Sequence, residues 1–246
     1  MRVDIETCIG CGECTHYCPM NALTLEKDHV TVNKEECVEC NICYYSGACP
    51  VDALQKEELT WPRAVRGVFS DPLQSHSTTG VPGRGTEEMK TNDVTGRFKE
   101  GYAGIAVELG RPGTGARFRD VEKVAMTMAR LGVKFEEKNP VTSLMIDKTS
   151  GKLRDDVLDE KVLSAIVEFE VPLDKMQEVL KALREVSFEI DTLFSLDLIC
   201  RIDKNNVAPA AELARAAGFE PSLNGKTNVG LGRPLAETGR KGSEVK

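Results

Sequence analysis

The sequence predicts an α+β protein made of a small cysteine-rich domain, a long Gly-rich loop segment, and a domain in which strands and helices alternate. Eight of the nine cysteines lie between Cys8 and Cys49. Ten of the 21 glycines fall between Trp61 and Arg119. From Gly101 onward, apolar residues recur first with the period of a strand and then with that of a helix. The expected parts are residues 1–58, 59–101 and 102–246.

The carboxy-terminal pattern predicts the order β-α-β-β-α-β, followed by an extra helix. Pro172 can open the second helix, because the first turn of a helix does not need its missing N–H. The expected elements are strands at 103–109, 142–147, 165–171 and 195–203, helices at 119–132 and from Pro172 to Leu183, and a last helix from Pro209 to Gly218. Because each strand has one apolar face, we expect both main helices to cover one side of a four-stranded antiparallel sheet, the ferredoxin-like plait.

The clustered cysteines form two runs of nearly equal spacing. They are Cys8-x2-Cys11-x2-Cys14-x3-Cys18-Pro19 and Cys37-x2-Cys40-x2-Cys43-x5-Cys49-Pro50. Three thiolates at this spacing can wrap one face of an iron–sulfur cube, and a fourth before a proline can reach a different cluster. The residues after each Cys-Pro also repeat, as Pro19-Met-Asn-Ala-Leu23 and Pro50-Val-Asp-Ala-Leu54, which is expected of a duplicated half-domain.

Over roughly its first quarter, this pattern resembles the bacterial ferredoxins that bind two [4Fe–4S] clusters. The resemblance implies two such clusters as cofactors, with the fourth cysteine of each run crossing to the other cluster. The implied ligands are Cys8, Cys11, Cys14 and Cys49 for the first cluster, and Cys37, Cys40, Cys43 and Cys18 for the second. The spacing after Cys43 is two residues longer than usual, and we expect Tyr44–Gly47 to bulge at the surface beside one cluster.

Two other interpretations of the cysteines compete with this one. Zinc binds paired Cys-x2-Cys knuckles, but a third cysteine at the same spacing followed by Cys-Pro is not a zinc pattern. Disulfides need an oxidising compartment, and nothing in the sequence indicates one. The two-cluster interpretation is therefore preferred.

The charge distribution indicates a protein partner rather than nucleic acid or a membrane. Residues 1–58 contain four Lys or Arg and eleven Asp or Glu, a net charge of −7, whereas the remainder has 28 of each sign. The chain therefore lacks the basic footprint of nucleic-acid binding, and its acidic end suits a redox partner or further subunit with a basic patch. Apolar runs are shorter than a membrane span, and residues 1–20 do not read as a signal peptide. We expect a cytoplasmic protein of a reducing, anaerobic cell.

The Gly-rich segment carries more chemistry than a linker needs. His76, among serines and threonines, does not have the surroundings of a core histidine; it could protonate a reduced substrate or hold its own turn. Charged residues follow among glycines, which let backbone approach a ligand, although the same charges could form an exposed salt-bridged face. The candidate catalytic residues are His76, Arg84, Glu87, Lys90 and Asp93. The candidates for binding an anionic group are Arg97 and the arginines of two Leu-Gly-Arg-Pro segments, Arg111 and Arg233.

One stretch of this segment resembles a known enzyme family. Its residues are Trp61-Pro-Arg63, Phe69-Ser-Asp-Pro72, His76 and the run from Gly83 to Arg97. They are similar to the amino-terminal portion of 6-hydroxynicotinate reductase. The resemblance implies an iron–sulfur enzyme that uses reduced ferredoxin on a nitrogen heterocycle, and hence a small heterocyclic or anionic substrate. Members of that family are longer and carry a further domain, so a partner chain is also implied.

Three hypotheses of function remain. The preferred one is a component of an anaerobic oxidoreductase that passes low-potential electrons to a small-molecule site or a partner. The second is a sulfur-trafficking or sulfurtransferase accessory of homocysteine biosynthesis, which needs an accessible thiol; Cys200 alternates with Leu196, Leu198 and Ile202 and is expected to be structural. The third is a non-catalytic relay module whose polar sheet face meets a partner or a second copy. The residues of that face are Glu108, Glu168, Glu170, Asp197 and Arg201.

Overall fold

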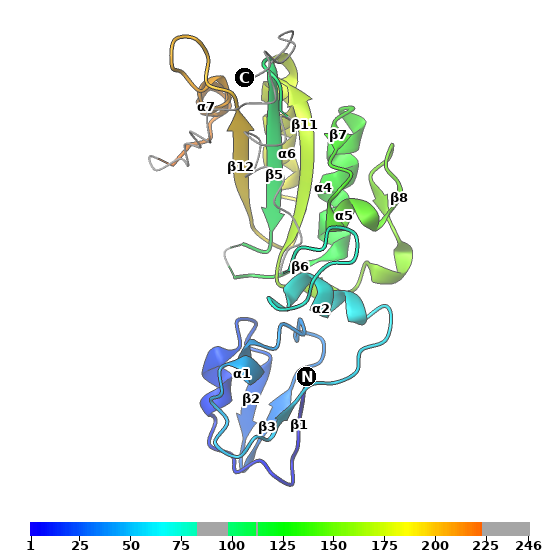
Figure 1. Ribbon diagram of the computed structural model, residues 1–246, viewed down its shortest axis with the longest axis vertical. Helices are drawn as coiled ribbons and strands as arrows, with labels where there is room; N and C mark the ends of the chain where they lie inside the picture. Colours follow the sequence, from blue (N-terminus) through cyan, green and yellow to red (C-terminus); the bar gives the residue numbers. More distant parts are fainter. Residues whose placement is uncertain (83–97, 112, 223–246) are drawn as a thin grey trace, which may run out of the picture.

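The structure is a computed structural model that describes residues 1–82, 98–111 and 113–222. A small amino-terminal unit lies at one end, and a four-stranded sheet with its helices lies at the other (Figure 1). The short helix α2 (Ala64–Ser70) lies where the two meet. Throughout these described ranges, every helix falls short of the length and hydrophobicity that a bilayer crossing requires.

The amino-terminal unit consists of two similar halves. In the first half, the 3-10 helix η1 (Glu13–Tyr17) is followed by the antiparallel hairpin of β2 (Leu23–Glu26) and β3 (His29–Val32). In the second half, α1 (Ile42–Tyr45) is followed by β4 (Leu54–Gln55), which pairs with β1 (Arg2–Val3). The buried apolar cluster of this unit is small, and its members are Met1, Cys14, Leu23, Val30, Cys43 and Leu54. So few apolar side chains cannot alone hold a unit of this size, and bound metal is the usual substitute.

The main sheet is antiparallel, with the strand order β12-β5-β11-β7. Its central strand β5 (Tyr102–Leu109) pairs on one side with β11 (Ala165–Pro172) and on the other with β12 (Phe194–Cys200). The fourth strand, β7 (Lys134–Phe135), is short and pairs only with β11. The alternation of apolar residues in the sequence predicted the three long strands, and the structure confirms them.

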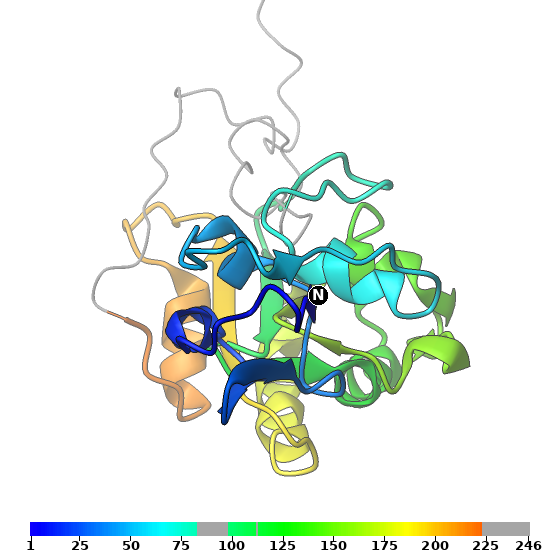
Figure 2. The same ribbon diagram turned by 90° about the horizontal axis from the view of Figure 1, so that it is seen from below.

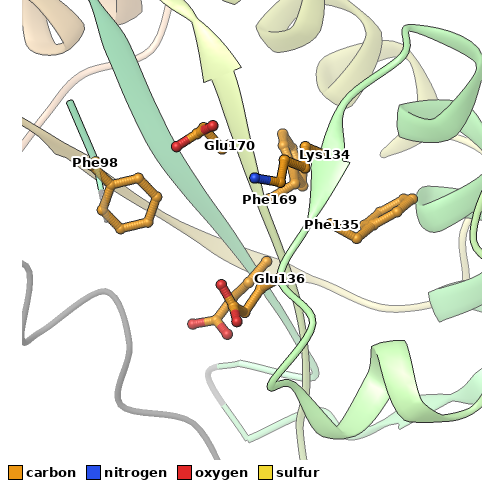
Figure 3. A pocket seen from close by; sticks show the side chains of 7 residues that line it. Phe98, Lys134, Phe135, Glu136, Phe169 and Glu170 are labelled. Atoms are coloured by element: carbon orange, nitrogen blue, oxygen red, sulfur yellow. The ribbon is translucent and has the colours of Figure 1, made fainter. Parts of the chain in front are cut away.

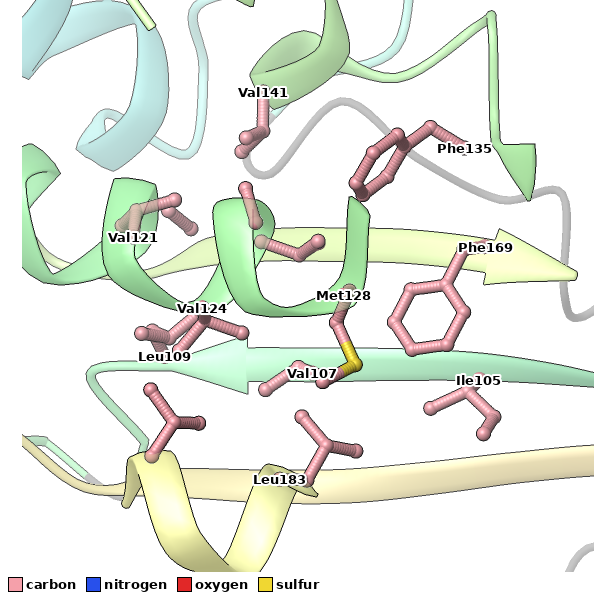
Figure 4. Close-up of a cluster of buried hydrophobic side chains, with 14 of the residues drawn as sticks. Ile105, Val107, Leu109, Val121, Val124, Met128, Phe135, Val141, Phe169 and Leu183 are labelled. Atoms are coloured by element: carbon pink, nitrogen blue, oxygen red, sulfur yellow. The ribbon is translucent and has the colours of Figure 1, made fainter. Parts of the chain in front are cut away.

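Two helices cover one face of this sheet (Figure 2). They are α4 (Phe118–Arg130) and α6 (Met176–Val186), and α7 (Pro209–Ala216) packs against α6 and β12. The apolar stripe of α4, which includes Val124 and Met128, meets Val107 and Leu109 of β5 and Leu183 of α6 in the core (Figure 4). The amphipathic periods predicted these helices, and the structure confirms them.

The remaining elements connect the sheet to its helices. They are β6 (Ala116–Arg117), which pairs with β10 (Lys161–Val162), β8 (Met145–Asp147), which pairs with β9 (Lys152–Leu153), α5 (Pro140–Ser143), η3 (Asp155–Val157) and η4 (Leu173–Lys175).

The strand expected at 142–147 is wrong. The side chain of Asn139 accepts hydrogen bonds from the backbone N–H groups of Val141 and Thr142, and Pro140 takes the first helical position, so α5 forms there instead. The following β8 pairs only with β9, outside the main sheet, whose fourth strand is β7. A two-residue strand leaves no periodic signal in the sequence.

Two boundaries and one segment also differ from expectation. Pro172 ends β11 in an extended conformation, and α6 begins only at Met176, after η4. The strand expected to reach residue 203 ends at Cys200, where its partner on β5 is Ala103. The segment 59–101, expected to be loop, contains α2.

Candidate metal centre

The eight clustered cysteines gather in two sets, each with three members from one run and one from the other. The thiols that act electrostatically on Cys14 are those of Cys49, Cys11 and Cys8. Those that act on Cys43 belong to Cys40, Cys18 and Cys37. These are the two crossed sets that the resemblance to bacterial ferredoxins implies.

Burial raises the pKa of several of these thiols. It is the largest cause for Cys40, whose pKa rises to about 11, and for Cys43, whose pKa rises to about 12. Burial also raises the pKa of Cys14 and Cys37. A metal ligand must be a thiolate, so iron bound here would have to displace these protons and offset the cost of burying negative charge.

The two Cys-Pro turns are structurally equivalent, as their repeated sequence predicted. The backbone N–H of Ala22 donates to Cys18 Sγ at 3.1 Å, and that of Ala53 donates to Cys49 Sγ at 3.2 Å. Asn21 and Asp52, just before these donors, both adopt the left-handed conformation, with φ of 50° and 53°. N–H groups that point at sulfur stabilise a thiolate, which is one way proteins adjust iron–sulfur centres.

A pocket lies among the first set of cysteines. Its lining residues are Cys8, Cys11, Cys14 and Cys49, with Val3, Ile9, Gly12, Val30, Val51, Ala53 and Leu54. Among the described residues, no three His, Cys, Asp or Glu side chains lie close enough to hold a single metal ion. A mononuclear zinc site needs its ligands around one ion, whereas in a [4Fe–4S] cube each cysteine binds a different iron and the thiols lie further apart. Four thiols around a pocket with apolar walls, and N–H groups directed at sulfur, fit such a cube.

Gly10 lets the first cysteine loop pass close to the β2–β3 turn. Its φ is 65°, and a Cβ at this position would stand 2.5 Å from the carbonyl oxygen of Asp28. A side chain would therefore be strained and would also push the loop away from the turn. The tight passage fixes the position of Cys8 and Cys11 relative to β2.

The added residues after Cys43 form part of α1 and lie at the surface, where Tyr44 and Tyr45 are partly exposed. Tyr45 is nevertheless anchored, because its hydroxyl donates to Asp71 at 2.8 Å and accepts from Lys56 at 2.7 Å. The two extra residues therefore connect the second cysteine run to the residue that follows α2.

His76 is buried, which corrects the expectation that it lacks core surroundings. Its side chain is only 6% exposed, and its ring packs edge-on against Phe69 at 5.8 Å. Nδ1 lies 3.2 Å from the backbone nitrogen of Thr78 and 2.6 Å from the Thr78 hydroxyl. His76 therefore holds its own turn, and burial lowers its pKa.

The stability of the protein should depend on pH through His76. Because the folded state lowers the pKa of this group below its ordinary value of about 6.5, the unfolded chain binds more protons in that range. The contribution of a neutral His76 is present above that value and is lost as the pH falls through it. We expect His76→Asn, which keeps an acceptor for Thr78, to reduce the fall in melting temperature between about pH 7.5 and pH 5. If the melting temperatures of the wild type and His76→Asn fall by the same amount over this pH range, the assignment to His76 is wrong.

Most other predicted site residues lie outside the described residues. Those so placed are Arg84, Glu87, Lys90, Asp93, Arg97 and Arg233. Arg111 is described, and its guanidinium pairs with Glu108 at 2.5 Å. Ser195 donates to the same carboxylate at 3.1 Å. Arg111 thus already balances the buried carboxylate of Glu108 and does not stand alone as an anion site. Glu108 lies on the second face of the sheet, the one opposite α4 and α6.

A second pocket lies at the β7 end of that face (Figure 3). It is lined by Phe98, Lys134, Phe135, Glu136, Glu168, Phe169 and Glu170. Glu168 is buried and accepts a hydrogen bond at 2.7 Å from Asn139, the residue that caps α5. The sequence marked Glu168 and Glu170 as one polar face, but it gave no sign that the short strand β7 brings Lys134 and Glu136 beside them.

Cys200 lies at the edge of the core. It is half-buried, packs with Leu196 and Leu198 against the main core, and has its pKa raised by burial. Ile202 does not share this environment, because it follows the end of β12 and is exposed. A half-buried thiol with a raised pKa is a poor nucleophile, which disfavours the sulfur-transfer hypothesis.

The comparisons with known proteins concern the amino-terminal unit. A family model described as a 4Fe-4S dicluster domain matches residues 1–55. The ferredoxin of Methanothermococcus thermolithotrophicus is 37% identical over 61 residues, which are 24% of this chain and 98% of the relative. Ferredoxin-1 of Rhodobacter capsulatus is 40% identical over 40 residues, 16% of this chain and 62% of the relative.

An uncharacterized ferredoxin of Methanocaldococcus jannaschii is 39% identical over 56 residues, 21% of this chain and 70% of the relative. No solved structure matches the chain. Through its amino-terminal residues, which form a ferredoxin-type iron–sulfur electron-transfer domain, the chain belongs to the ferredoxin family.

Proposed function

We propose that the chain is an iron–sulfur electron-transfer protein or subunit of an anaerobic ferredoxin-type oxidoreductase, active in the cytoplasm, whose eight clustered cysteines hold two [4Fe–4S] clusters. The observation that carries the proposal is the gathering of the thiols into two crossed sets of four. When bound, such clusters supply one-electron chemistry at low potential. The chain itself supplies the thiolates, the backbone N–H donors to sulfur and the apolar side chains that line the pocket of the first set.

In this proposal, residues 1–58 form the cluster domain, 59–101 contribute to a site or interface, and 102–246 form a ferredoxin-like plait. The strand order β12-β5-β11-β7, with α4 and α6 as the connections that cross one face, supports the plait. The acidic surface of residues 1–58 supports a redox partner or further subunit with a basic patch.

The finer part of the proposal is similarity to 6-hydroxynicotinate reductase, with a small heterocyclic or anionic substrate. Its support is the sequence between Trp61 and Arg97. Among the described residues, Arg111 is paired with Glu108, so an anionic substrate would have to compete with that carboxylate for it.

Iron analysis of anaerobically purified protein tests the proposal. We expect about eight iron atoms and as many acid-labile sulfides per chain, because each cube contains four of each. Zinc is measured in the same sample, since zinc in place of iron would indicate a mononuclear site. Fewer than about six irons per chain in a folded protein would contradict two clusters.

A further inference from the structure

The hydrogen bonds and ion pairs that join the amino-terminal unit to the rest of the chain gather on its second cysteine run, although Met20, just after the first run, also lies against Gly115. In the part of the chain that the structure describes, the hydrogen bonds and ion pairs that link residues 1–58 to residues after 60 end within residues 34–45. This stretch contains Cys37, Cys40 and Cys43, three members of the second set. The loop of the first set, residues 8–14, makes no such bond among the described residues.

Arg66 on α2 is at the centre of this contact. Its side chain is only 4% exposed. The guanidinium donates to the backbone carbonyls of Lys34 at 3.0 Å, Glu35 at 3.0 Å and Cys37 at 2.9 Å. Its Nε also donates to the carboxylate of Glu160, in the connection before β10. All three carbonyls face Nη1, whose two N–H groups are shared among them, so one nitrogen of a buried guanidinium holds three carbonyls of one loop close together.

Both ends of α2 hold the same loop. Before the helix, Arg63 donates two hydrogen bonds to Glu39, at 3.0 and 2.6 Å. After the helix, Asp71 accepts from Asn41 at 2.8 Å and from Tyr45. The helix therefore lies along the second cysteine run from Glu39 to Tyr45, with Arg66 between its two ends.

We propose that Arg66 is a positioning residue for the second metal centre, the one held by Cys18, Cys37, Cys40 and Cys43. It orients the Cys37 loop and places a buried positive charge beside it, so the group bound there is easier to reduce than it would be beside a neutral residue. The second centre thereby faces the carboxy-terminal unit, and the first remains accessible to an external redox protein. This inference rests on the proposed function, because it presupposes two bound clusters.

Removing the charge of Glu160 should shift the reduction potential of the second centre in the opposite direction from removing the charge of Arg66. Reduction potentials of such centres depend on nearby charge, burial and hydrogen bonds. Arg66→Gln keeps an amide donor for the carbonyls but removes the positive charge, so the potential of the second centre should fall. Glu160→Gln removes the negative charge that partly neutralises Arg66, so the potential of the same centre should rise. A general loosening of the loop would instead move the potential in the same direction in both variants.

The experiment is an anaerobic redox titration of the full chain, in which the hyperfine-shifted signals of the cysteine β-protons follow each centre separately. We expect opposite shifts at the second centre, none at the first, and a potential close to wild type in Arg66→Lys. Arg154→Gln, which removes an exposed arginine paired with Asp156, is the matched charge control and should move neither centre.

Shifts of both centres, of neither, or of one sign in both variants would overturn the role of Arg66. If Arg66→Gln does not fold, Glu160→Gln alone decides by the sign of its shift. A chain that binds no clusters would instead contradict the proposed function, and iron content measured on each sample separates the two failures.

Discussion

The Cys14→Ala variant should lose about half of its iron, and residues 1–55 should lose their ordered structure when the remaining cluster is removed. Cys14 is buried in the small core of the amino-terminal unit, and its thiol faces those of Cys49, Cys11 and Cys8. A bound iron–sulfur cluster would be the main link between the two halves of the amino-terminal unit, because few apolar side chains pack between these halves. The measurements are iron per chain and the circular dichroism of anaerobic samples before and after chelation.

The matched control for this prediction is Cys200→Ala. Cys200 is also partly buried, but it lies at the edge of the main core and not beside the clustered cysteines. It should keep all of the iron and lose about 1 kcal/mol of stability or less. Full iron content in Cys14→Ala, or a comparable loss in Cys200→Ala, would contradict the assignment of the first set.

The three-cysteine loops could be predicted because their information is local, whereas the crossing of the fourth cysteine was implied by the resemblance to bacterial ferredoxins. Spacings of three residues and a following proline restrict which thiols one loop can present together, and the repeated residues Asn21 and Asp52 impose the same backbone turn twice. The long strands and helices were predictable for a related reason. An eight-residue strand such as β5 repeats its apolar period often enough to be read, and so do the stripes of α4 and α6.

The elements that connect the two units could not be predicted in this way. Helix α2 has seven residues, includes Gly67, and is held by Val65 and Phe69 in the main core and by the long-range hydrogen bonds of Arg63, Arg66 and Asp71. A single arginine inside the run Ala-Val-Arg-Gly-Val-Phe-Ser gives no periodic signal, although a charge between apolar neighbours is the one hint of a buried partner. The burial of His76 likewise depends on Phe69, which the sequence did not place in a helix.

The largest loss of stability outside the cysteines is expected for Phe118→Ala. Phe118 is the first residue of α4 and is fully buried, and its ring packs edge-on against Phe69 of α2 at 5.0 Å. Truncation removes a large buried ring and leaves a cavity that the surrounding strands and helices can fill only in part. The free energy of unfolding should fall by about 3–5 kcal/mol.

Denaturant unfolding of the anaerobic protein, followed by far-ultraviolet circular dichroism, measures this loss, with Phe118→Leu as the control that retains most of the volume and should cost about 1 kcal/mol. Because Phe118 packs against Phe69, the alanine variant should also loosen the packing of α2 against the core. The hydrogen bond from Arg66 to the Cys37 carbonyl should then weaken. The hyperfine-shifted signals of the second centre should then broaden, while those of the first stay sharp. Equal stability of the alanine and leucine variants would show that this ring does not join α2 to α4.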